Sequence, residues 1–97
     1  MKSKKNGIIL YMKEILKIDN LRKEVDKIDN IIVKNLLKRL SIVQKIGKLK
    51  KNNKLNVVDK KREDIVIKKI QNKAKKFKKE ITDIYKSIIK NSRKIQK

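Results

Sequence analysis

The stretch LRKEVDKIDNIIVKNLLKRLSIVQKIGKLK, which runs from Leu21 to Lys50, decides the fold. Its apolar residues recur at the spacing that places them on one face of an α-helix. This stripe consists of Leu21, Val25, Ile28, Ile32, Leu36, Val43 and Ile46. Because the chain contains no proline, a long helix can pass through this stretch without interruption. The pattern predicts one long helix that begins at about Met12 or Asp19 and ends at about Lys51.

Two shorter helices are predicted after a loop. Residues 51–58 are rich in asparagine and lose the helical periodicity, so we expect a loop there. Asp59 is suited to cap the N-terminus of a second helix, which should end at about residues 76–79. A third helix is expected from about residues 80–81 to the C-terminus. The predicted fold class is therefore all-α, with three helices per chain, one long and two shorter.

The length of the chain, 97 residues, is that of one small domain. We expect residues 1–11 to form a disordered basic tail and residues 12–97 to form a single helical domain. Three helices of this size bury little surface alone, so an oligomer is expected. No apolar run approaches the roughly 18 residues that span a bilayer, and none has the features of a signal peptide. These observations predict a soluble, cytoplasmic protein.

The formal net charge of +21 is compatible with nucleic acid, an anionic membrane or a small anion as a partner. Lysines are spread over every segment, whereas the arginines are only Arg22, Arg39, Arg62 and Arg93. This distribution indicates a whole-chain bias more than a designed binding face. A small basic nucleic-acid-binding protein remains an alternative, although aromatic residues, which stack on bases, make up only 3% of the chain.

The chain contains neither cysteine nor histidine. Disulfides and thiolate chemistry are therefore excluded, and a metal site or general base would lack its commonest residue. We expect no metal and no cofactor. An enzyme made from these residues would act mainly by positioning its substrate and by electrostatics.

Polar residues interrupt the apolar stripes at four positions. Arg39 and Lys50 fall within about 20° of the centre of the first stripe. Glu63 lies in the stripe of the second predicted helix, and Ser92 lies in that of the third. Because an unpaired buried charge is costly, these positions predict a polar pocket. Gly47, on the first helix, would let another segment approach the backbone closely.

The spacing of these polar residues suits a small ligand. Arg39 and Lys50 lie three turns apart, about 16 Å along one helix face. The remaining groups form two pairs one turn apart, Asp59 with Glu63 and Ser92 with Gln96. Two cations, carboxylates, a hydroxyl and an amide suit a compact molecule that carries more than one anionic group and a hydroxyl.

Five segments carry a resemblance to a known family: LRKEVDKID (21–29), LLKR (36–39), IGKLK (46–50), DKKRE (59–63) and SRKIQ (92–96). In their order and spacing they resemble the all-α class of chorismate mutases, over residues 19–97. The resemblance implies an intertwined homodimer with two equivalent sites shared between chains. It also implies the rearrangement of chorismate to prephenate, in phenylalanine and tyrosine biosynthesis, without a cofactor.

The resemblance also implies catalytic roles. Lys50 would contact a carboxylate and the ether oxygen of the breaking bond, and Gln96 would donate to the same oxygen. Glu63 would accept the ring hydroxyl of the substrate, helped by the backbone N–H of Asp59. Isochorismate pyruvate lyase is a rival on a similar fold, but that branch is understood to lack the acidic pair and the serine found here at Ser92.

Substrate-binding roles are implied for Arg39 and, from the partner chain, Arg22, which would bind the two carboxylates. Arg62 and Ser92 would complete the pocket, whereas Arg93 falls outside the motif and is expected at the surface. Arg22 lies roughly 42 Å along its own helix from the pocket lysine, so it can serve a site only across a dimer. An inactive coiled-coil dimer is disfavoured because the second and third helices are short.

Overall fold

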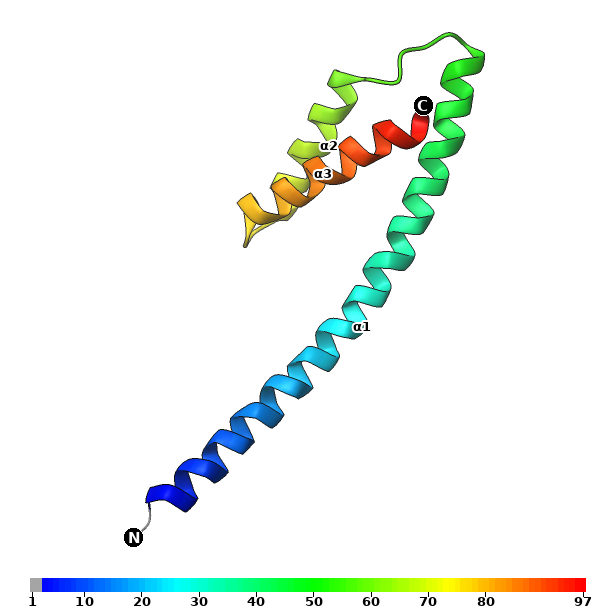
Figure 1. The fold of residues 1–97 in the computed structure, drawn as a ribbon. Coiled ribbons are helices and arrows are strands. Elements are labelled where there is room, and N and C mark those ends of the chain that lie inside the picture. The colour runs from blue at the N-terminus through cyan, green and yellow to red at the C-terminus, as the bar shows by residue number, and fades with distance from the viewer. Residues whose placement is uncertain (1–2) are drawn as a thin grey trace. The chain divides into compact units, whose positions relative to one another are not determined.

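The computed structural model describes residues 3–97, which form three helices (Figure 1). These are α1 (Ser3–Asn52), α2 (Lys60–Lys73) and α3 (Lys78–Gln96). No strand occurs among these residues. The predicted all-α class, with one long helix and two shorter ones, is confirmed.

Helix α1 begins earlier than the expected start at Met12 or Asp19. Residues 3–11 contain no proline, and Gly7 weakens a helix by only about 1 kcal/mol relative to alanine, so nothing ends the helix there. Residues 3–11 therefore belong to α1 in place of the expected loose tail, and residues 1 and 2 lie outside the described range. The division of the chain into a tail at residues 1–11 and a domain at residues 12–97 stays a prediction.

The N-terminus of α2 is capped as expected. The Asp59 carboxylate accepts a hydrogen bond from the backbone N–H of Arg62 at 3.0 Å. Glu63 lies in the first turn, where a negative charge complements the helix dipole. The cap fixes the position at which the loop after α1 becomes helix, and it brings both carboxylates to the same end of α2.

The connection between α2 and α3 differs from the prediction. Helix α2 ends at Lys73, a few residues before the expected boundary, because Ala74 adopts an extended conformation. Phe77 then takes a left-handed conformation, with φ of 55°, and is 70% exposed. Phe77 therefore lies beyond the end of α2 and outside its apolar stripe. Asparagine and glycine usually mark such a turn, and neither occurs at this position.

The chain divides into two compact units, residues 1–37 and residues 38–97. In the second unit α2 packs against α3, and the end of α3 approaches α1 at Gly47. A Cβ atom added to Gly47 would lie 2.7 Å from the Cα atom of Gln96. As predicted, the absence of a side chain at Gly47 lets another segment, here the backbone of Gln96, approach α1 closely.

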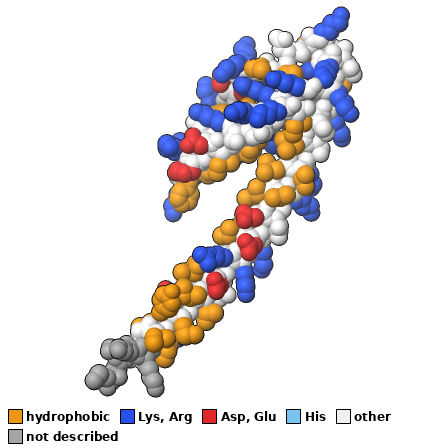
Figure 2. Space-filling model, viewed as in Figure 1, with side chains coloured by type: hydrophobic (Ala, Val, Ile, Leu, Met, Phe, Trp, Pro, Cys, Tyr) orange, Lys and Arg blue, Asp and Glu red, His pale blue; other side chains and the backbone are white. Residues whose placement is uncertain are grey.

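The first unit, described from residue 3, is the N-terminal part of α1. Its apolar stripe is open to solvent: Leu21, Val25, Ile28 and Ile32 are 48–60% exposed. Figure 2 shows hydrophobic side chains along this helix, between lysines and acidic residues. None of the helices described contains an uncharged apolar stretch of the length that a bilayer requires.

Candidate active site

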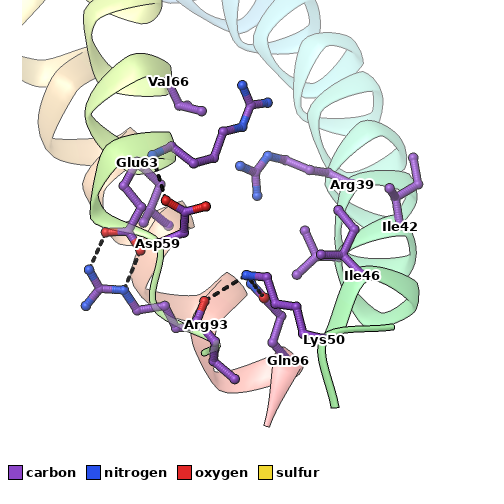
Figure 3. A pocket seen from close by; sticks show the side chains of 13 residues that line it. Arg39, Ile42, Ile46, Lys50, Asp59, Glu63, Val66, Arg93 and Gln96 are labelled. Atoms are coloured by element: carbon purple, nitrogen blue, oxygen red, sulfur yellow. Dashed lines mark hydrogen bonds and ion pairs between the residues drawn. The ribbon is translucent and has the colours of Figure 1, made fainter. Parts of the chain in front are cut away.

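A cavity of about 440 Å³ lies within the second unit (Figure 3). Pockets for small molecules typically have this size. Six of the eight predicted site residues line it: Arg39, Lys50, Asp59, Arg62, Glu63 and Gln96. The rest of its wall is made by Ile42, Val43, Ile46, Val57, Val66, Ile89 and Arg93. The cavity therefore combines cations, carboxylates and an amide with an apolar floor.

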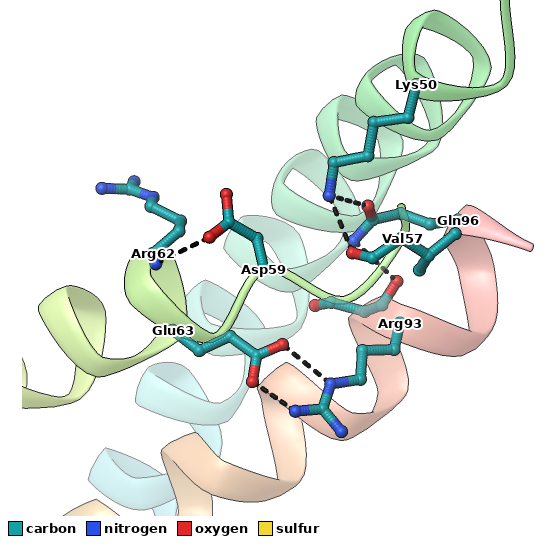
Figure 4. A network of polar contacts seen from close by, with 8 residues as sticks. Lys50, Val57, Asp59, Arg62, Glu63, Arg93 and Gln96 are labelled. Carbon is teal, nitrogen blue, oxygen red and sulfur yellow. Dashed lines mark hydrogen bonds and ion pairs between the residues drawn. The ribbon is translucent and has the colours of Figure 1, made fainter. Parts of the chain in front are cut away.

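Lys50 joins three parts of the chain (Figure 4). Its ammonium donates to the side-chain oxygen of Gln96 at 2.7 Å and to the backbone carbonyl of Val57 at 2.8 Å. These bonds link α1 to the loop and to the end of α3. An ammonium carries three donors, so these two bonds fix its position and leave a third for a ligand.

Gln96 is held from both ends of its amide. The oxygen accepts the bond from Lys50, and the nitrogen donates a long bond, 3.4 Å, to the backbone carbonyl of Ser92. Gln96 is the last helical residue of α3, where fraying is common. The contacts with Lys50 and with the backbone at Gly47 tie this helix end to α1.

Arg39 is held by Ser92. Its guanidinium donates to the Ser92 hydroxyl at 2.6 Å and lies 5.9 Å from the centre of the Tyr85 ring, close enough for a cation–π contact. The hydroxyl in turn donates to the carbonyl of Ile88 at 2.7 Å. Ser92 is only 5% exposed and does not line the cavity. The structure therefore gives Ser92 a supporting position behind an arginine of the cavity wall.

Glu63 pairs with Arg93, which was expected at the surface. The Arg93 Nε atom donates to one carboxylate oxygen of Glu63 at 2.7 Å, and Nη2 donates to the other. The side chains are 17% (Glu63) and 34% (Arg93) exposed. Hydrogen bonding from Arg93 lowers the pKa of Glu63 despite the opposing effect of burial. The surface prediction for Arg93 was wrong because helical position alone does not show that the acid of α2 lies opposite.

One signal in the sequence pointed to Arg93. The chain uses lysine almost everywhere, and three of its four arginines were already assigned to the site. Bidentate pairing with a carboxylate requires the planar guanidinium of arginine, which lysine cannot supply. The fourth arginine, directly after Ser92, was therefore a candidate for pairing with a carboxylate.

Arg22 belongs to the first unit, where its side chain is 75% exposed and lies 3.7 Å from the carboxylate of Asp19. Its assignment to a partner chain's site stays a prediction. No group of three or more potential metal ligands occurs among the described residues.

Comparison with known proteins gives the family. A solved structure, a conserved hypothetical protein from Pyrococcus furiosus, is 40% identical, with a TM-score of 0.68. The match covers 84% of this chain and 96% of that one. No curated protein matches the chain significantly. The family described as chorismate mutase type II matches residues 21–97, a range that contains all eight predicted site residues. The chain belongs to the chorismate mutase type II family.

Proposed function

We propose that the protein is a chorismate mutase that rearranges chorismate to prephenate, a step toward phenylalanine and tyrosine. The observation that carries the proposal is the contact between Lys50 and Gln96, at 2.7 Å, in the wall of a cavity that also presents Arg39 and Glu63. Family membership supplies the class of chemistry. The arrangement of polar groups explains how this chain would carry out that chemistry.

The reaction needs no acid, base or nucleophile from the protein. One C–O bond breaks while one C–C bond forms within the same molecule, with no proton transfer and no covalent intermediate. The enzyme must hold the enolpyruvyl side chain over the ring, and such orientation can supply a large part of the acceleration. This suits a chain without cysteine or histidine.

Charge develops on the ether oxygen as the bond breaks. A fixed ammonium close to that oxygen stabilises the transition state more than the ground state. Lys50 is fixed by Val57 and Gln96 before any substrate enters, so it needs little reorganisation. The amide nitrogen of Gln96, whose bond to the Ser92 carbonyl is long, would supply a second donor to the ether oxygen.

Arginines would bind the carboxylates of the substrate. Arg39 is oriented by its bond to Ser92, and Arg62 lines the same cavity from the first turn of α2. Guanidinium groups match carboxylates with two parallel hydrogen bonds. Glu63, whose carboxylate is kept charged by Arg93, would accept the ring hydroxyl near the Asp59 end of α2.

We further propose that the active form is a homodimer in which Arg22 of each chain serves the site of the other. Exposure of the apolar stripe on residues 21–32 supports this, because a face of this kind is normally covered. Val43 and Ala74 are the only buried apolar residues among those described. A second copy of the chain would cover the stripe.

The purified chain should be tested with chorismate and, separately, with isochorismate. We expect loss of chorismate with formation of prephenate, undiminished after exhaustive dialysis against EDTA. The acidic pair Asp59 and Glu63, together with Ser92, favours the mutase over the lyase. Faster release of pyruvate from isochorismate would assign the lyase activity instead, and turnover of neither substrate would refute both.

A further inference from the structure

The Glu63–Arg93 pair forms part of two cavities. It lines the candidate active site, and with Ile89 it also lines a second cavity of about 330 Å³ between α2 and α3. The second cavity is bordered by exposed lysines, among them Lys60 and Lys90. The pair therefore separates the site from a solvated basic surface, and only one of its two members was predicted to act in the site.

The geometry of the pair restricts the Glu63 carboxylate. Arg93 donates one hydrogen bond to each carboxylate oxygen, so the plane of the carboxylate is fixed by two contacts. A carboxylate offers about four acceptor positions, two on each oxygen. One position on each oxygen therefore remains for a hydroxyl that enters the cavity.

Among the described residues, Arg93 is the only cation that hydrogen-bonds to Glu63, although Lys86 and Lys90 of α3 also line the second cavity. Lys60, one turn earlier on α2, acts on Glu63 through its charge alone, and the carboxylate of Asp59 opposes it. Arg39 and Lys50 line the cavity from α1, and each is already engaged with a residue of α3. Arg62 lines the same cavity and has no recorded bond to Glu63 among the described side chains.

We propose that Arg93 is a positioning residue for the substrate hydroxyl, acting by fixing the orientation and charge of the Glu63 carboxylate. This inference rests on the proposed function, in which Glu63 accepts that hydroxyl. Arg93 itself need not touch the substrate. Its removal leaves the carboxylate half-buried, free to rotate, and without the contact that favours its ionised form.

The test compares Arg93→Met with Arg93→Lys and with Lys94→Met. The last variant removes the same charge from the next position, which is exposed and is not among the groups that shift the pKa of Glu63. We expect Arg93→Met to lower kcat/KM by about ten- to a hundredfold, as loss of a strong charged hydrogen bond does. Arg93→Lys should recover part of the loss, and Lys94→Met should match the wild type.

The pH dependence of kcat/KM provides a second measurement, which a general loss of stability would leave unchanged. The pKa of Glu63 is lowered by Arg93 and raised by burial, so it should rise when Arg93 is removed. The acid limb of kcat/KM for Arg93→Met should therefore lie at higher pH than that of the wild type. A carbon-13 NMR titration of Glu63, identified with Glu63→Gln, should show the same shift even in a protein without turnover.

The decisive comparison places Arg93→Met in a Glu63→Gln background. We expect the two losses not to add, because Arg93 acts through Glu63. Additive losses, or an Arg93→Met variant that matches Lys94→Met in rate and in the Glu63 titration, would overturn the inference. If Arg93→Met does not fold, Arg93→Gln carries the same comparison. Failure of the proposed function would be visible separately, as a wild-type protein that does not turn over chorismate.

Discussion

Replacing Gly47 with alanine should reduce activity far more than stability. The added Cβ would lie 2.7 Å from Cα, 2.9 Å from the carbonyl oxygen and 3.1 Å from Cβ of Gln96. Carbon atoms pack at about 3.5–4.0 Å, so the end of α3 must move by about 0.8 Å or more. Two of the three atoms are backbone atoms, so no side-chain rotation relieves the clash.

The two consequences of this movement differ in size. Alanine strengthens the helix by about 1 kcal/mol, whereas overpacking costs about 1–3 kcal/mol, so the net loss of stability should be about 0–2 kcal/mol. The 2.7 Å contact between Gln96 and Lys50 would lengthen beyond a useful hydrogen bond. A misplacement of about 1 Å at a reacting centre can cost about a hundredfold in rate.

Steady-state kinetics and thermal unfolding of Gly47→Ala measure the two effects. Gly7→Ala is the matched control, because a Cβ at Gly7 meets nothing within 4 Å. That variant should keep its rate and gain up to about 1 kcal/mol of helix stability. A Gly47→Ala protein with the kcat/KM of the wild type would refute the argument that Gly47 sets the position of Gln96.

Three further predictions concern the same site. Lys50→Ala should lower kcat/KM by about a thousandfold or more while circular dichroism shows an intact fold, and near-normal kinetics would contradict its role. Ser92→Ala should raise KM more than it lowers kcat, because Arg39 loses the hydroxyl that orients it; an unchanged KM would count against this. Arg22→Ala and Lys50→Ala chains, each inactive alone, should regain up to half of wild-type activity as heterodimers after joint refolding. Verified heterodimers without recovery would refute the shared site.

The sequence predicted the features that depend on position along a single helix. The helical spacing of the apolar residues indicated the long helix, and the side-chain chemistry of Asp59 indicated the start of α2. Charges inside the apolar stripes pointed to Arg39, Lys50 and Glu63, all of which line the cavity. Each of these inferences needs only the rotation per residue and the cost of burying a charge.

The features that depend on how two helices meet were not predictable in this way. Arg93 pairs with an acid 30 positions away on another helix, and the periodicity of α3 does not report which residue lies opposite. The sequence did not indicate that the Ser92 hydroxyl would accept a hydrogen bond from Arg39, and the predicted role of Ser92 in binding substrate stays a prediction. The turn at Phe77 carries no glycine or asparagine, so local chemistry gave no indication of where α2 ends.

The scarcity of buried apolar residues bears on how this protein responds to dilution. Among the described residues, Val43 and Ala74 alone are buried apolar side chains, while the stripe on residues 21–32 is open to solvent. If two copies associate as proposed, most of the hydrophobic stabilisation would come from their association, and folding and association would form one equilibrium. The unfolding midpoint of the proposed dimer should then rise with protein concentration, and dilution should lower it.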